Sequence, residues 1–194
     1  SQWSGGTFAN LPIGQGMSMN LLQMTSIYQA LANGGERIEP RLIEKTVKAD
    51  GTEIAAEEPK RTRVVSPQTA RTVVDMFRAV TQGDPAGVQQ GTGASAAIKG
   101  YQTSGKTGTA QQVDPKTGAY SNSNHWITFS GIAPADDPRF VIGLMMDNPQ
   151  RGPDGGAGGT AAPLFNHIGT WLLDHYNVPL SPTEGPKLML EARN

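Results

Sequence analysis

The residues with the clearest capacity for chemistry lie between Gly100 and Gln111, where a lysine stands among threonines and glycines. Residues 100–107 satisfy the phosphate-loop pattern, a glycine, four residues and then Gly-Lys-Thr, which would bind the phosphates of a nucleotide. That chemistry requires an apolar strand before the loop and a helix directly after it, so that helical N–H groups surround the phosphates. Here Ala-Ser-Ala-Ala-Ile-Lys precedes the loop, and Gly, Thr and Pro occur where the helix would begin. The pattern therefore does not indicate a nucleotide triphosphatase.

Lys-Thr-Gly occurs twice, at 106–108 and 116–118, so the tripeptide alone identifies nothing. The second copy follows Asp114-Pro115, a pair typical of turns. The first copy belongs to a longer string, Ser104-Gly105-Lys106-Thr107-Gly108-Thr109-Ala110-Gln111. This string resembles the third signature of the penicillin-binding proteins, the serine D,D-transpeptidases that cross-link peptidoglycan.

The resemblance extends over essentially the whole chain. Ile13-Gly14-Gln15-Gly16 precedes a helical Leu-Leu-Gln-Met, and Ala32-Asn33-Gly34-Gly35 follows it. Gly91-Thr92-Gly93 precedes the signature, and residues 126–134 read Trp-Ile-Thr-Phe-Ser-Gly-Ile-Ala-Pro. In order and spacing, these segments are similar to the class B, monofunctional penicillin-binding proteins of cell division, particularly the actinobacterial ones.

The resemblance implies roles for the signature residues in acyl transfer. Lys106 supplies a positive field and a contact to the serine of the family's second motif. Thr107 and Thr109 donate hydroxyls to the substrate carboxylate, and Gly108 lets the substrate lie close. The backbone N–H of Thr109 is one oxyanion-hole donor, a contact worth on the order of 3 kcal/mol in the transition state. The candidate site residues are thus Lys106 and Thr109 as catalytic groups and Ser104, Gly105, Thr107 and Gly108 as substrate-binding groups; the alternative is an ordinary edge strand with a solvated lysine.

Two family motifs, Ser-x-x-Lys and Ser-x-Asn, are expected to be absent from this chain. The nucleophile of the family lies in Ser-x-x-Lys and its proton-relay serine in Ser-x-Asn, both upstream of the third signature. No serine here has a lysine three places on, and the Ser-Asn run at 121–124 follows the signature and lacks the Ser-x-Asn spacing. We therefore expect residues 1–194 to be the C-terminal part of a transpeptidase domain, with the substrate-binding wall but no attacking group, and inactive alone. The absence of an initial methionine agrees with a polypeptide cut from a longer one.

Composition excludes several classes of function. With 16 basic and 17 acidic side chains, the net charge of −1 argues against a nucleic-acid surface or a polybasic membrane patch. The absence of cysteine excludes disulfides and thiolate nucleophiles and is compatible with an extracytoplasmic compartment. The three histidines lack metal-ligand spacing. We expect no metal and no cofactor, because serine acyl transfer needs only a base, an oxyanion hole and a bound carboxylate.

Apolar periodicity predicts three helices. The first spans 18–32, with Asn20 and Gln23 as a capping pair, and the second begins at Ser66-Pro67 and ends near Gly83. The third follows Thr160 as its cap. The residues expected on the apolar faces of these helices are Leu21, Met24, Ile27, Tyr28, Leu31, Val73, Met76, Phe77, Val80, Leu164, Phe165, Ile168, Trp171, Leu172 and His175.

Three strands are predicted, joined by short turns into an antiparallel meander. Threonine and short side chains favour a strand at 101–112, alternation predicts one at 125–133, and a nearly continuous apolar run predicts one at 140–147. Trp126, Phe129, Met145 and Met146 are expected in the core. Residues 37–54 read as an exposed two-stranded ribbon, with the charged cluster 57–63 at its solvated end. The segments 87–100 and 152–159 read as loops, and residues 179–194 form a Pro-rich tail.

By resemblance the fold is the α/β (α+β type) transpeptidase fold, an antiparallel sheet flanked by helices. A three-stranded remnant would leave an apolar face uncovered, so we expect the isolated fragment to associate, misfold or require its upstream half. The expected partners are peptidoglycan stem peptides, β-lactams and division proteins, at the extracytoplasmic face of the plasma membrane, with an upstream anchor. The alternatives are a serine β-lactamase and a non-catalytic β-lactam-sensing or interaction domain on the same fold.

Overall fold

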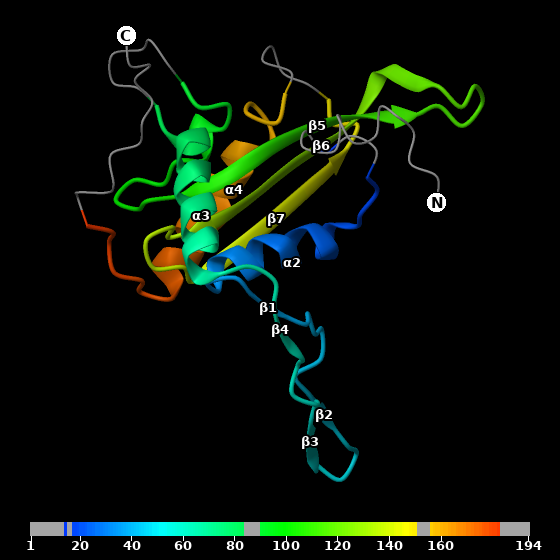
Figure 1. Ribbon diagram of the computed structural model, residues 1–194. Helices are drawn as coiled ribbons and strands as arrows, with labels where there is room; N and C mark the ends of the chain where they lie inside the picture. Colours follow the sequence, from blue (N-terminus) through cyan, green and yellow to red (C-terminus); the bar gives the residue numbers. More distant parts are fainter. Residues whose placement is uncertain (1–13, 15–16, 84–89, 151–155, 183–194) are drawn as a thin grey trace.

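A meander of three antiparallel strands organises the molecule (Figure 1). The computed structural model describes residues 14, 17–83, 90–150 and 156–182. The strands are β5 (Ser104–Val113), β6 (Tyr120–Ala133) and β7 (Phe140–Asp147), paired in that order. The predicted meander is therefore confirmed, with β7 at its expected bounds. The start of β6 precedes the expected His125, because Tyr120 still pairs with Val113 of β5.

The strand β5 begins later than the predicted Tyr101, because the residues before Ser104 bond to other parts of the chain. The Tyr101 hydroxyl donates to the Val178 carbonyl at 2.6 Å. The Gln102 N–H donates to the Ser181 hydroxyl at 2.9 Å, and the Thr81 hydroxyl donates to the Thr103 carbonyl at 2.7 Å. Propensity favours an extended conformation here, but pairing partners decide where the strand starts.

Helices cover both faces of the sheet (Figure 1). The helices α2 (Leu21–Ala32) and α3 (Pro67–Thr81) lie on one face, where Val74 of α3 packs on Ile132 of β6. The helix α4 (Ala161–His175) lies on the other face, against Phe129. Alternation along β6 sends odd-numbered residues toward α4 and even-numbered ones toward α2 and α3. The expected uncovered apolar face is thus not a bare face of the sheet, although large apolar side chains remain exposed on the outer helix surfaces.

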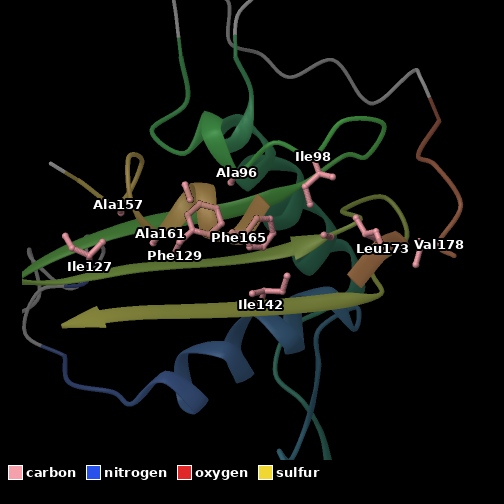
Figure 2. Close-up of a cluster of buried hydrophobic side chains, with 12 residues drawn as sticks. Ala96, Ile98, Ile127, Phe129, Ile142, Ala157, Ala161, Phe165, Leu173 and Val178 are labelled. Carbon is pink, nitrogen blue, oxygen red and sulfur yellow. The ribbon is translucent and has the colours of Figure 1, made fainter. Parts of the chain in front are cut away.

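The largest buried cluster lies between the sheet and α4 (Figure 2). Phe129 and Phe165 form its centre, with ring centroids 4.9 Å apart and both side chains fully buried. Gly131 allows this approach, because a Cβ atom there would lie 2.7 Å from Phe165. The other members of the cluster are Ala96, Ile98, Ile127, Ala133, Ile142, Ala157, Ala161, Ala162, Leu173 and Val178.

Local sequence signals set two helix starts correctly. Asn20 and Gln23 form the predicted capping box at α2, with the Gln23 N–H donating to Asn20 Oδ1 at 2.8 Å. The Ser66 hydroxyl accepts from the Thr69 N–H at 3.0 Å at α3. The predicted cap of the third helix is wrong. Thr160 directly precedes α4, but its hydroxyl donates to the Gly156 carbonyl and does not accept from an N–H group of the helix.

The predicted apolar helix faces are partly wrong. Met76 is 64% exposed and Trp171 is 59% exposed. The sheet-facing positions are instead occupied largely by small residues, such as Gly169, where a Cβ atom would lie 2.6 Å from Ile98. Close packing of helix on sheet selects small side chains, and this displaces the large ones that periodicity assigns to the core. The other expected core or apolar-face residues that are exposed are Ile27, Trp126, Met145, Leu164 and His175.

The ribbon projects away from the sheet and consists of two short ladders (Figure 1). In the outer ladder β2 (Lys45–Val47) pairs with β3 (Glu53–Ala55), and in the inner one β1 (Glu36–Ile38) pairs with β4 (Arg61–Arg63). The cluster 57–63 is therefore not the solvated end of the ribbon, since it contains β4 at the base.

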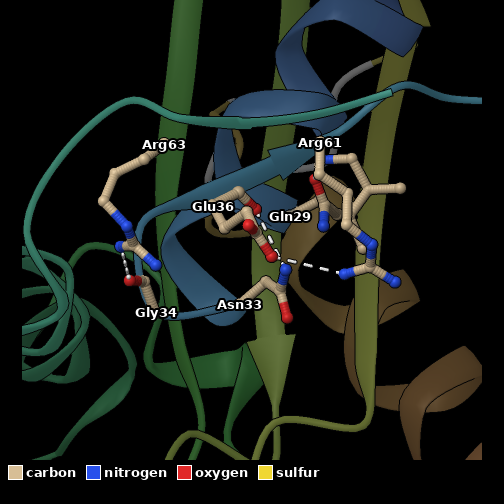
Figure 3. Close-up of polar contacts among 7 residues, drawn as sticks. Gln29, Asn33, Gly34, Glu36, Arg61 and Arg63 are labelled. Atoms are coloured by element: carbon tan, nitrogen blue, oxygen red, sulfur yellow. Dashed lines mark hydrogen bonds and ion pairs between the residues drawn. The ribbon is translucent and has the colours of Figure 1, made fainter. Parts of the chain in front are cut away.

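The base of the ribbon is attached to the C-terminal end of α2 (Figure 3). Arg63 donates to the Gly34 carbonyl at 2.9 Å, and Arg61 lies 3.3 Å from the Glu36 carboxylate. The Gln29 side chain accepts from the Ile38 N–H at 3.1 Å. Of the remaining predicted segments, 84–89, 152–155 and 183–194 lie outside the described residues.

Candidate active site

The ladder between β5 and β6 divides the signature residues between two faces of the sheet. Lys106 pairs with Ser130 and Gly108 with Thr128, on the face that carries α3. Thr107 pairs with Phe129 and Thr109 with Ile127, on the α4 face. The string that is contiguous in sequence thus presents its cation on one face and its two threonine hydroxyls on the other.

A cleft of about 500 Å³ lies beside Thr107 and Thr109. Its other walls are two glycine-rich segments, 90–95 and 156–159. These segments are joined by the Ser95 hydroxyl, which donates to the Gly158 carbonyl. Within the described chain no strand pairs with the outer edge of β5, so backbone groups there remain available next to the cleft.

A third hydroxyl belongs to this site. Thr92 Oγ1 lies 2.9 Å from Thr107 Oγ1, and the two residues share the same cleft. Gly91 makes this position possible, because a Cβ atom there would lie 2.2 Å from the Val80 carbonyl oxygen at the end of α3. Sequence reasoning noted the Gly91-Thr92-Gly93 segment but did not name Thr92 as a site residue, since its neighbour in space is fifteen positions away along the chain.

Lys106 is exposed, and its Nζ donates to the Thr107 carbonyl at 2.8 Å. It does not line the cleft. The helix α3 lies across the beginning of β5 on the face that carries this lysine (Figure 1). The side chain therefore lies at the boundary between the α3 face and solvent.

Three other signature residues contribute through packing. Ser104 is fully buried and Gly105 is buried, so neither lines the cleft. A Cβ atom at Gly105 would lie 2.6 Å from the Phe129 ring, and one at Gly108 would lie 2.2 Å from Thr128 Oγ1. The glycines of the signature are therefore required by the neighbouring strand, in addition to any approach of a substrate.

The expectation that Ser-x-Asn is absent is wrong, because this spacing occurs at Ser18-Met19-Asn20. The Asn20 side chain caps α2, and α2 packs on β7, where a Cβ atom at Gly143 would meet Thr25 Oγ1. Since β7 is at the opposite edge of the sheet from β5, this Ser-x-Asn serves the helix start and not the signature strand.

The described residues contain no cluster of histidine, cysteine and carboxylate side chains that could hold a metal ion.

The position of the Gly-Lys-Thr residues in the sheet does not fit a phosphate-binding loop. Gly105, Lys106 and Thr107 lie inside β5, and no helix follows them. No helix in the described ranges is long and apolar enough to span a membrane.

An antiparallel sheet between helices, with a Ser-Gly-Lys-Thr-Gly-Thr edge strand beside a hydroxyl-lined cleft, is the arrangement expected of a transpeptidase fold. Residues 1–169 match the family described as "Penicillin binding protein transpeptidase domain". The chain belongs to this family.

Two mycobacterial members of this family, both named PbpB, are similar to the chain. The chain is 61% identical to penicillin-binding protein PbpB of Mycolicibacterium smegmatis and 60% identical to that of Mycobacterium tuberculosis, with 98% of this chain covered in both comparisons. It spans only 30% and 28% of the lengths of these relatives. The crystal structure of penicillin binding protein 3 from Mycobacterium tuberculosis complexed with ampicillin is similar at a TM-score of 0.89, with 59% identity, and covers 99% of this chain and 42% of that chain.

Proposed function

We propose that this chain is the C-terminal part of a class B D,D-transpeptidase domain that cross-links stem peptides in septal peptidoglycan. In this proposal the chain supplies the wall that binds the C-terminal carboxylate of a stem peptide or of a β-lactam. The observation that carries it is the gathering of three hydroxyls from two distant segments, Thr107 and Thr109 of β5 and Thr92, around one cleft. A carboxylate is an acceptor of several hydrogen bonds, which such hydroxyls donate.

The chemistry follows from charge and geometry. Attack of a serine on the D-Ala-D-Ala carbonyl forms a tetrahedral oxyanion, and its collapse expels D-alanine and leaves an acyl-enzyme, which an acceptor amine resolves. Thr107 and Thr109 hold the carboxylate of the donor peptide and thereby place its carbonyl along β5. The backbone N–H of Thr109 donates to the oxyanion, and Lys106 contributes a positive field.

The attacking serine is proposed to come from residues upstream of this chain. The chain contains no Ser-x-x-Lys, and it spans about 30% of the first relative. We therefore infer that the chain alone is not acylated. The upstream half of the transpeptidase domain is its partner, and the complete protein acts with division proteins at the extracytoplasmic face of the plasma membrane, held by an upstream anchor. Residues 179–194 are proposed to be a Pro-rich tail of this domain, and Ser181 attaches its described part through hydrogen bonds with Gln102 and Asp136.

Penicillin binding protein 3 of Mycobacterium tuberculosis has been solved with ampicillin and with aztreonam, which supports β-lactams as probes of this site. The test is intact mass spectrometry after penicillin is mixed with the protein extended upstream through its Ser-x-x-Lys, with this chain alone as the blank. A single persistent adduct on the extended protein alone is expected. An adduct that is rapidly hydrolysed would indicate a β-lactamase, and no adduct on the extended protein would contradict the proposed enzyme.

A further inference from the structure

A second polar group of atoms lies behind the signature strand, away from the cleft. Arg78, Ser104 and Ser130 are respectively 4%, 0% and 1% exposed. Within the described residues, four of their side-chain atoms have no hydrogen-bond partner: Arg78 Nε and Nη1, Ser104 Oγ and Ser130 Oγ. Buried polar atoms in folded proteins are nearly always paired, with protein or with ordered water.

These three side chains share one region of the α3 face. Val74 packs on Ile132, which pairs with Ser104, and the Thr81 hydroxyl bonds to the carbonyl of Thr103. Arg78 lies between Val74 and Thr81 on the same face of α3, and it is therefore directed at the start of β5. Ser130 lies two residues from Ile132 on β6, and so its hydroxyl is on that face as well.

Among the described residues, the charge of Arg78 has one carboxylate within 4 Å. This is Asp75, with Nη1 and Oδ1 3.7 Å apart, which is too long for a hydrogen bond. The guanidinium group offers only donors, whereas the two serine hydroxyls both donate and accept. A water molecule among them would accept from the arginine and donate to a serine oxygen, which would complete the pairing that direct contacts leave open.

We propose that Arg78, Ser104 and Ser130 form a buried water-binding site that fixes the start of β5 from behind. Ser130 is the ladder partner of Lys106, so the site lies beside the signature lysine on the same face of the sheet. Arg78 is thereby a positioning residue for Lys106, and it touches no substrate. This positioning role depends on the proposed function, whereas the water site does not.

The water site is tested by a crystal structure of the complete protein at a resolution that shows ordered water. We expect density within about 3.2 Å of Arg78 and of at least one of the two serine hydroxyls. Direct hydrogen bonds from Arg78 Nε and Nη1 to protein atoms, without such density, would overturn the site whatever the enzyme does.

The positioning role is tested by penicillin acylation of the complete protein. We expect Arg78→Met to lower the acylation rate constant at saturating penicillin roughly tenfold, with a smaller change in the noncovalent dissociation constant. Arg71→Met, an exposed arginine of the same helix, is the matched control and is expected to acylate normally.

If Arg78→Met does not fold, Ser130→Ala replaces it, because this variant removes one hydroxyl and leaves the packing intact. We expect a loss of about threefold with Ser130→Ala and none with Ser123→Ala, an exposed serine of the same strand. An unchanged rate in the folded Arg78 or Ser130 variant would refute the positioning role. Absence of acylation in the unsubstituted protein would instead refute the proposed function.

Discussion

The two copies of Lys-Thr-Gly have the same side chains and opposite surroundings. Lys106, Thr107 and Gly108 lie within β5, where each is paired with a residue of β6. The second copy, 116–118, lies in the exposed turn between these strands, where Asp114 Oδ1 accepts from the Lys116 N–H at 2.7 Å. The ladder sends alternate side chains of the first copy to defined faces, and the segment 90–95 packed beside it brings Thr92 to Thr107. The turn leaves the second copy in solvent. The chemistry therefore depends on the ladder and the segments packed on it, and not on the tripeptide.

The largest expected effect concerns the glycines of the two copies. Alanine at Gly105 places a Cβ atom 2.6 Å from the Phe129 ring and 2.8 Å from the Ser130 carbonyl oxygen. We expect Gly105→Ala to lower the free energy of unfolding by about 3 kcal/mol, because backbone and core must both shift. Gly118 has φ +70° and open space around it, so Gly118→Ala is expected to cost only about 1 kcal/mol of backbone strain. Urea denaturation of the complete protein measures both, and equal losses would contradict the comparison.

A smaller effect is expected at the hydroxyl pair of the cleft. Thr92→Val removes the partner of Thr107 Oγ1 and keeps the shape of the side chain. Since one hydrogen bond contributes about 1 kcal/mol, we expect penicillin acylation of the complete protein to slow about fivefold. Thr117→Val, the corresponding threonine of the second copy, is the control and is expected to have no effect. A loss of the same size in both variants would show that the contact with Thr92 is irrelevant.

The smallest effect concerns the turn itself. Asp114 Oδ1 accepts from the N–H groups of both Lys116 and Thr117. We expect Asp114→Ala to lower the free energy of unfolding by about 1 kcal/mol and to leave acylation unchanged, because the turn does not contact the cleft. Thermal denaturation and acylation assays of the same sample test both parts. Slower acylation in this variant would place the second copy in the site after all.

Local signals explain which parts of the fold the sequence predicts. The caps at Asn20 and Ser66 involve atoms within three residues, and the nearly continuous apolar run of β7 is contained within the strand itself. The faces of α3 and α4 depend on how closely each helix approaches the sheet, and this is decided by residues far away in sequence. Met76 and Trp171 were therefore assigned to the wrong side.

In the candidate site, too, local sequence predicts some residues, and the packing of distant segments determines the others. The signature string identifies Lys106, Thr107 and Thr109 as the residues to consider, and the cleft contains the two threonines. Neither Thr92 nor the segment 156–159 follows from local pattern, because both reach the cleft only through the packing of distant segments. The burial of Ser104 is likewise a consequence of α3 crossing β5, which no periodicity in the strand predicts.

The most direct test of the account compares the two lysines in the complete protein. The measurement is the second-order rate constant of penicillin acylation for Lys106→Ala and Lys116→Ala, followed by intact mass. We expect Lys106→Ala to lower the rate about 100-fold or more, because the proposed positive field of Lys106 on the carboxylate and the oxyanion is lost. Lys116→Ala is expected to react like the unsubstituted protein. Equal rates for the two variants would contradict the claim that the ladder context makes the first copy the binding wall.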